Sequence, residues 1–204
     1  MNKSWAVIGI MAAVIGVVLI ALFAVGATLV GQYNAIQLKD EAVNAAWAQV
    51  VNVHQRRADL VPNLVNTVKG YAAHEQQTLT RVIEARSKAV SMAVNIQNAQ
   101  TLQDFQSAQG ELQSALARLM VSVEQYPNLK ANKSFQDLQV QLEGTENRIT
   151  VERQRYIEAV QDFNTFIRMF PTNLVASYFG YSEKPNFTVE NERQISDAPI
   201  VNFN

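Results

Sequence analysis

The residues best suited to chemistry lie in QRRADLVPNLVNTVKGYAAHEQ, at positions 55–76. His74 and Glu75 are adjacent, as in the zinc-binding motif His-Glu-x-x-His, but the second histidine of that motif is absent. With Arg56 and Asp59 they could form the site of a metal-dependent hydrolase only if unidentified carboxylates completed the metal ligands. This hydrolase is therefore kept only as an alternative hypothesis.

Other catalytic arrangements are missing from the sequence. It contains no cysteine, which removes disulfides, thiolate zinc sites and cysteine nucleophiles. It contains neither a Gly-rich phosphate loop nor a serine in a Gly-x-Ser-x-Gly turn. The net charge of -1 gives no electrostatic footprint for nucleic acid. We therefore expect no catalytic residue, no metal, no cofactor and no nucleic-acid partner.

The chain beyond Tyr33 has the periodicity of packed helices. Its apolar residues recur at spacings of three and four, with a break near Gly70 and helix-stopping prolines at Pro127 and Pro171. In the last long segment the period is nearer to about 3.6 than 3.5, which suits a globular bundle more than a long coiled coil. The sequence predicts an all-α protein with an antiparallel bundle of about four long helices, and then a short helix ending at Gly180.

Polar residues on the apolar stripes, the rows of apolar residues on one face of each predicted helix, are more informative than the other polar residues. Arg57 lies on the apolar stripe of the first helical segment, residues 33–71. Glu146 flanks the apolar stripe of the fourth segment, residues 135–170. An antiparallel alignment of Tyr33 with Phe170 places Arg57 opposite Glu146. Either the two form an inward ion pair that fixes the register, or the Arg57 stem lies on the core and lifts its guanidinium to water.

Pro62 interrupts the hydrogen bonding of the first segment. It bends one continuous helix, or Asp59 caps a helix that restarts near it, and the sequence leaves open whether the helix over residues 33–71 is continuous. Either reading makes residues 56–63 a bend rather than a reaction centre. The residues predicted to have structural or interaction roles are Arg57, Glu146, Arg56, Asp59, Pro62 and Asn63.

Residues 6–30 contain no charged residue and predict a transmembrane helix. About 25 residues span roughly 37 Å, more than the ~30 Å hydrocarbon layer. The alternative is a cleaved signal peptide, but its apolar region is usually only ~7–15 residues long. We expect a single-pass protein of the plasma (inner) membrane with the lipid bilayer as a partner. Lys3 and Lys39 lean only slightly toward an extracytoplasmic main domain, so its side stays open.

The expected organisation has three parts. Residues 1–32 form the amino-terminal segment with the transmembrane helix, residues 33–180 form the helical bundle, and residues 181–204 form an extended or disordered tail.

AWAQVVNVHQRRADLVPNLVNTVKGYAAHEQ, from residue 46 to 76, resembles the signature of the LemA family. The resemblance continues with AR at 85–86, YPNLKAN at 126–132, LEGTENRI at 142–149, YIEAVQDFNTFIRMFP up to Pro171, and the terminal APIVNF. It implies a bacterial membrane helix followed by long helices, without an established catalytic activity, and an amino terminus outside the cell. It also implies a TPM-domain protein or a membrane zinc metalloprotease as a possible partner. The departures are Val61, Asn66 and His54.

The favoured hypothesis is a non-catalytic, membrane-anchored interaction or assembly protein whose bundle forms a homo-oligomer or binds a membrane partner. The amide-rich outer face of residues 102–126 is either solvated or a contact between subunits. A stress-response or signalling membrane component is the further alternative. Aromatic and apolar residues at the end of the fourth segment either lie at the lipid surface or cap the end of the bundle: Phe166, Phe170, Leu174, Tyr178, Phe179 and Tyr181.

Overall fold

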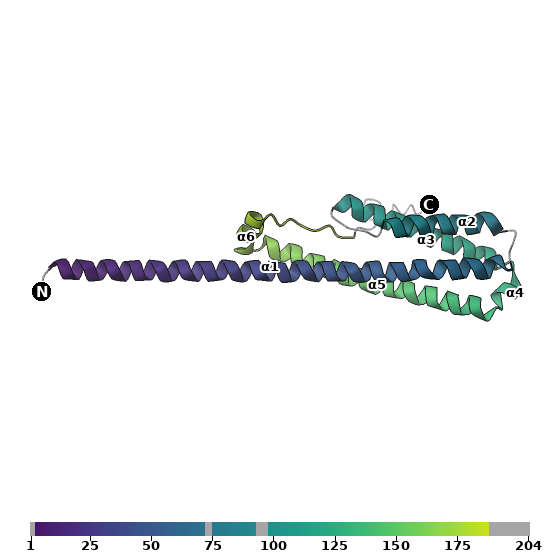
Figure 1. Cartoon of the computed structure of the whole chain (residues 1–204), viewed down its shortest axis with the longest axis horizontal. Coiled ribbons are helices and arrows are strands. Elements are labelled where there is room, and N and C mark those ends of the chain that lie inside the picture. The colour runs from purple at the N-terminus through teal and green to yellow at the C-terminus, as the bar shows by residue number, and fades with distance from the viewer. Residues whose placement is uncertain (1–2, 72–74, 93–97, 188–204) are drawn as a thin grey trace, which may run out of the picture. The chain divides into compact units, whose positions relative to one another are not determined.

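A computed structural model describes residues 3–71, 75–92 and 98–187, with side chains from residue 9 onward (Figure 1). The described residues form helices and no strand, which confirms the all-α prediction. The helices are α1 Lys3–Lys69, α2 Gln76–Ser91, α3 Ala99–Val123, α4 Pro127–Lys130, α5 Lys133–Arg168 and α6 Thr172–Phe179. Helix α4 is not predicted from the sequence, where Pro127 indicates only a helix stop, although proline is also favoured in the first turn of a helix.

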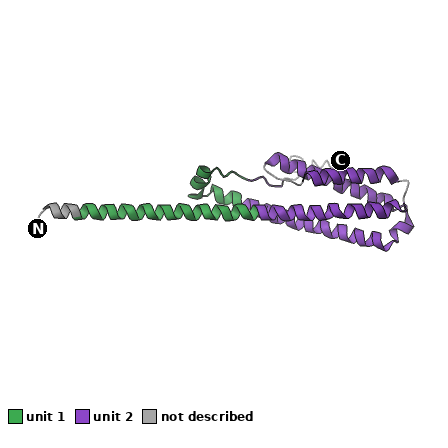
Figure 2. Cartoon of the chain, viewed as in Figure 1, with its two compact units in different colours: residues 1–43, 162–183 green, residues 44–161, 184–204 purple. Residues whose placement is uncertain are grey.

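Contacts divide the chain into two compact units (Figure 2). Unit 1 consists of residues 1–43 and 162–183, and unit 2 of residues 44–161 and 184–204. Both α1 and α5 therefore contribute residues to each unit. The two units are not the same divisions as the three parts predicted from the sequence, which end at residues 32 and 180. Those three parts stay a prediction.

In unit 1, the first part of α1, residues 10–30, exposes apolar side chains on all its faces. Ile10, Leu19 and Phe23 are among the exposed residues of this part. By length and composition α1 can cross a membrane, and it is the one such helix among the described residues. The apolar residues of this first part are exposed, whereas those of the later part of α1 are buried in a core.

The rest of unit 1 packs the end of α5 and α6 against α1. Its buried apolar residues are Ile36, Val43, Phe163, Ile167, Val175 and Ala176. The Thr172 hydroxyl at the start of α6 donates a 2.6 Å hydrogen bond to Gln32 Oε1 of α1. As predicted, α6 ends at Gly180, which adopts a φ of 76° in the left-handed region where glycine carries no steric penalty.

In unit 2, α2 and α3 lie side by side, and α5 runs antiparallel to α1 (Figure 1). The antiparallel direction is evident from ring and ion pairs: Trp47 contacts Tyr156, and further along α1 Arg57 contacts Glu146. The Asn98 side chain caps α3 by accepting from the Thr101 N–H at 2.9 Å. Apolar residues from all these helices form the core: Val61, Leu64, Val65, Val68, Leu79, Val82, Ala89, Leu112, Leu116, Leu119, Val123, Leu129, Phe135 and Leu138.

The first helix continues through Pro62, so the alternative of a restart capped by Asp59 is wrong. A proline at this position cannot donate to the carbonyl of Ala58, four residues earlier. Arg86 of α2 replaces the missing donor, because its Nε donates a 2.7 Å hydrogen bond to the Ala58 oxygen. Asp59 instead accepts from Gln55 at 2.8 Å and lies 3.9 Å from Arg86 Nη2.

Candidate functional site

Arg57 is the centre of a buried polar cluster in unit 2. It is 3% exposed on the inner face of α1, and its Nη1 donates a 2.9 Å hydrogen bond to Glu146 Oε2 of α5. The structure therefore has the inward ion pair and not the alternative in which the guanidinium reaches water. Burial lowers the pKa of Arg57 and the Glu146 carboxylate opposes that shift; the guanidinium remains a cation.

Gln109 of α3 extends this cluster to α2. Its Oε1 accepts a 2.9 Å hydrogen bond from Arg57 Nη2, and its Nε2 donates to the Ala89 carbonyl at 3.2 Å. The second bond fixes which way the amide points, because only its nitrogen can donate. Arg57, Gln109 and Glu146 thus connect α1, α2, α3 and α5 through hydrogen bonds.

His54 lies one turn before Arg57 and contacts the same amide. Its Nδ1 is 3.0 Å from Gln109 Oε1 and 3.3 Å from Arg57 Nη2; the shorter contact is a hydrogen bond when Nδ1 carries the proton, because an amide oxygen only accepts. Burial, and then the positive charge of Arg57, lower the pKa of His54 from 6.5 to about 3. His54 is therefore neutral near pH 7 and a poor base there, which does not suit general acid–base catalysis.

A cavity of about 330 Å³ borders this cluster. Arg57 Nε faces no hydrogen-bond partner although it is buried, and Glu146 is half-buried, with Gln113 Nε2 donating to its Oε1 at 3.4 Å. The residues that line the cavity are His54, Arg57, Gln106, Gln109, Gly110, Gln113, Glu146, Ile149, Arg153, Ile157 and Phe187.

An aromatic group packs next to the polar cluster. The ring of Phe105 meets the His54 ring edge-on at 5.1 Å, and the Trp47 ring lies 5.0 Å from Phe105 and 5.4 Å from Tyr156. Phe187 completes the group, 5.3 Å from Tyr156. Such edge-on pairs contribute about 0.5–1.5 kcal/mol beyond the area that they bury.

The non-helical segment 184–187 is attached to this aromatic group. The Tyr156 hydroxyl donates a 3.0 Å hydrogen bond to the Pro185 carbonyl, and burial raises the pKa of Tyr156 to about 12. The Arg153 guanidinium lies 5.1 Å from the centre of the Phe187 ring. The part of the predicted tail that the structure describes is therefore held by specific contacts, and residues 188–204 lie outside the described residues.

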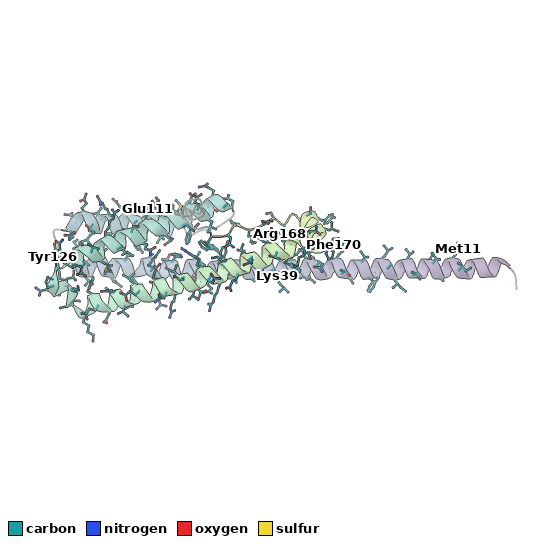
Figure 3. All side chains as sticks on the ribbon, turned by 180° about the vertical axis from the view of Figure 1, so that it is seen from behind. Met11, Lys39, Glu111, Tyr126, Arg168 and Phe170 are labelled. Carbon is teal, nitrogen blue, oxygen red and sulfur yellow. The ribbon has the colours of Figure 1, made fainter. Side chains whose placement is uncertain are left out.

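The remaining predicted site residues do not join this cluster. Arg56, Pro62 and Asn63 are exposed on α1, and the Asn63 carbonyl accepts from the Thr67 hydroxyl at 2.8 Å. Their interaction roles stay a prediction. Figure 3 shows side chains over the described part of the chain, where no three His, Asp or Glu side chains gather as metal ligands.

Of the other residues of the hydrolase hypothesis, Glu75 and Asp59 make contacts outside the Arg57 cluster. His74 lies outside the described residues, and Glu75 accepts a 3.3 Å hydrogen bond from the hydroxyl of Tyr126. Asp59 is engaged with Gln55 and Arg86.

His54 and Gln109 are not among the site residues predicted from the sequence. Both stood on apolar stripes, and a polar residue at a core position is the signal that could have identified them, because buried polar groups require partners. The cluster therefore joins four helices through hydrogen bonds, with Arg57 Nε left without a partner.

Comparison with known proteins gives one family. The pattern that defines the LemA family matches residues 46–203. Magnetosome protein MamQ 2 of Paramagnetospirillum magneticum is 26% identical over 194 residues, which cover 86% of this chain and 70% of that protein. Magnetosome protein MamQ of Magnetospirillum gryphiswaldense is 24% identical over 201 residues, 89% and 73% of the two chains. Protein LemA of Metamycoplasma hominis is 25% identical over 147 residues, 72% and 64% of the two chains.

Proposed function

Because this chain belongs to the LemA family, we propose that it is a membrane-anchored, non-catalytic protein that assembles with itself or with a membrane partner. The plasma (inner) membrane is the proposed location, with a single crossing by α1.

One observation carries the anchoring. The first part of α1 exposes apolar side chains on all its faces, whereas a helix that packs on a protein core in water exposes polar residues on its outer face. No charged residue occurs between Lys3 and Lys39 of the same helix. A hydrocarbon layer of ~30 Å accounts for both features, because about 20 apolar residues are needed to cross it.

The buried cluster supports a structural role in place of catalysis. Arg57 and Gln109 form hydrogen bonds with neighbouring helices, and His54 Nδ1 lies 3.0 Å from Gln109 Oε1. A nucleophile activated by a nearby base, the usual sign of covalent catalysis, is not present in this cluster. The network fixes how four helices pack, which suits a protein that presents a defined surface to a partner.

The assembly part of the proposal rests on the relatives and on α3. Two of the relatives are named magnetosome proteins, and we propose that this chain acts together with other proteins at a membrane. Exposed uncharged residues of α3 such as Gln103 and Ser107 can hydrogen-bond across a contact between subunits without burying ions. A TPM-domain protein or a membrane zinc metalloprotease remains a predicted partner.

The test uses the full chain in cell membranes. We expect the chain to remain in the membrane pellet after alkaline carbonate extraction, and chemical cross-linking to give a homo-oligomer or a covalent adduct with another membrane protein. Size measurement in detergent then gives the number of copies.

Two outcomes contradict the proposal. Release of the intact chain by carbonate contradicts the anchoring, and a monomer without any cross-linked partner contradicts the assembly role. A divalent metal that copurifies and is lost in His74→Ala would support the hydrolase alternative instead.

A further inference from the structure

Unit 1 contains an apolar groove between α1 and α6. Its volume is about 460 Å³, within the ~300–1,000 Å³ of typical ligand sites, and carbon atoms form nearly all of its surface. The lining residues are Leu29, Val30 and Tyr33 of α1, and Leu174, Val175, Tyr178 and Phe179 of α6. A site without donors or acceptors selects an apolar ligand.

Contacts within unit 1 hold the two walls of the groove together. The Thr172 hydroxyl bonds to Gln32 at the start of α6, and the rings of Tyr33 and Phe179 lie 4.7 Å apart at its other end. Val175 and Ala176 are buried between these two contacts. The groove is therefore a built feature of the fold, since both ends of α6 are attached to α1.

Apolar residues of α6 are also exposed beyond the groove. Leu174 and Tyr178 are four residues apart and lie on one face of α6, with exposed fractions of 59% and 84%, and Phe170, two residues before the helix, is 80% exposed. Residues 169–182 contain no charged side chain, and Arg168 and Glu183, which flank this stretch, lie 3.6 Å from each other. Exposed aromatic and apolar residues on one face of a short helix are typical of a helix at the membrane interface.

The groove lies on the part of α1 that approaches its first charged residue. Leu29 and Val30 belong to the charge-free stretch that we propose to be in the bilayer, and Lys39, the first charge after it, is paired with Asp162 at 2.6 Å. Tyr33 and Tyr178 have the amphipathic rings that favour the boundary between hydrocarbon and headgroups.

We propose that this groove binds an acyl chain of a bilayer phospholipid, with α6 lying in the membrane interface. The groove is continuous with the exposed apolar surface of α1, so lipid reaches it without crossing water. The two partners of the Arg168–Glu183 pair neutralise each other, as do those of the Lys39–Asp162 pair, and no charged residue lines the groove to attract a charged peptide. The inference rests on the proposed membrane anchoring.

The experiment places the photoreactive amino acid p-benzoylphenylalanine at position 178 of the full chain in cell membranes. After irradiation we expect covalent adducts with the mass of a phospholipid at this position. The same amino acid at Val121, an exposed apolar residue of α3, serves as the control and is expected to give no lipid adduct.

A second pair of variants separates occupation of the groove from simple immersion in lipid. Leu29→Trp fills the groove and is expected to lower the lipid adduct at position 178 several-fold. Leu22→Trp, on the same charge-free stretch but outside the groove lining, is expected to leave it unchanged.

Each contrary outcome has its own meaning. A cross-linked dimer at position 178 shows that a second copy occupies the groove and overturns the inference. The absence of a lipid adduct at position 178, or equal adduct yields for the two tryptophan variants, also overturns the inference. In that case the anchoring stands if the chain resists carbonate extraction. Release of the chain by carbonate overturns the anchoring and the inference together.

Discussion

Arg86 Nε donates a 2.7 Å hydrogen bond to the backbone carbonyl of Ala58, the carbonyl that Pro62 leaves without its helical donor. A side chain of α2 thereby completes the hydrogen bonding of α1. This bond explains how α1 accommodates an internal proline and continues to Lys69.

We predict that Arg86→Met lowers the free energy of unfolding by about 1–3 kcal/mol, because a partly buried carbonyl loses its donor. In a Pro62→Ala background the same change costs less, since residue 62 then supplies its own N–H. The measurement is a double-mutant cycle by denaturant titration of the full chain in detergent. Arg81→Met, at an exposed position of α2, is the control. Equal costs in both backgrounds contradict this role of Arg86.

The Arg57–Glu146 pair gives the second prediction. Glu146→Ala leaves the buried guanidinium without its carboxylate, a change that costs about 3–5 kcal/mol when both partners are buried and less here because Glu146 is 43% exposed. The exchange Arg57→Glu with Glu146→Arg should be more stable than either single change in the same denaturation assay. If it is not, the pair does not fix the register of α1 on α5.

The third prediction concerns pH and His54. The folded-state pKa of about 3 is below the unfolded value of 6.5, so between these values the unfolded chain binds more protons. The stability that neutral His54 provides is therefore fully present above about pH 6.5 and is lost as the pH falls toward 3. The difference amounts to at most about 4–5 kcal/mol, at about 1.4 kcal/mol per pKa unit.

Unfolding titrations at several pH values check this prediction. His54→Gln removes the titrating group but keeps a side chain that can hydrogen-bond. Its free energy of unfolding should fall less steeply between pH 6.5 and 4 than that of the unchanged chain. Parallel curves for the two proteins mean that His54 titrates normally in the folded state.

The fourth prediction concerns Phe187. Phe187→Ala removes ring contacts with Tyr156 and Trp47 and the contact with Arg153, and should lower the free energy of unfolding by about 1–3 kcal/mol. The matched control is Phe170→Ala, because Phe170 is largely exposed and its removal should change the free energy by no more than about 0.5 kcal/mol. Similar effects in both variants would show that segment 184–187 adds no stability.

Much of the helix pattern could be predicted from the sequence. The ends of α3 and α5 fall just before Pro127 and Pro171, and α6 ends at Gly180, because these residues constrain the backbone locally. The antiparallel register also placed Arg57 opposite Glu146, since apolar stripes fix which faces meet. These features depend on near neighbours or on a simple period.

The sequence by itself determined the helices, their apolar faces and the long charge-free stretch of α1, because periodicity and backbone stereochemistry are encoded residue by residue. The tertiary structure alone decided that Gln109 orients His54 and Arg57, and that Arg86 supplies the donor missing at Pro62. Hydrogen bonds between helices require atoms to meet within about 3 Å. A stripe of apolar residues does not specify the rotation and tilt of each helix to that precision.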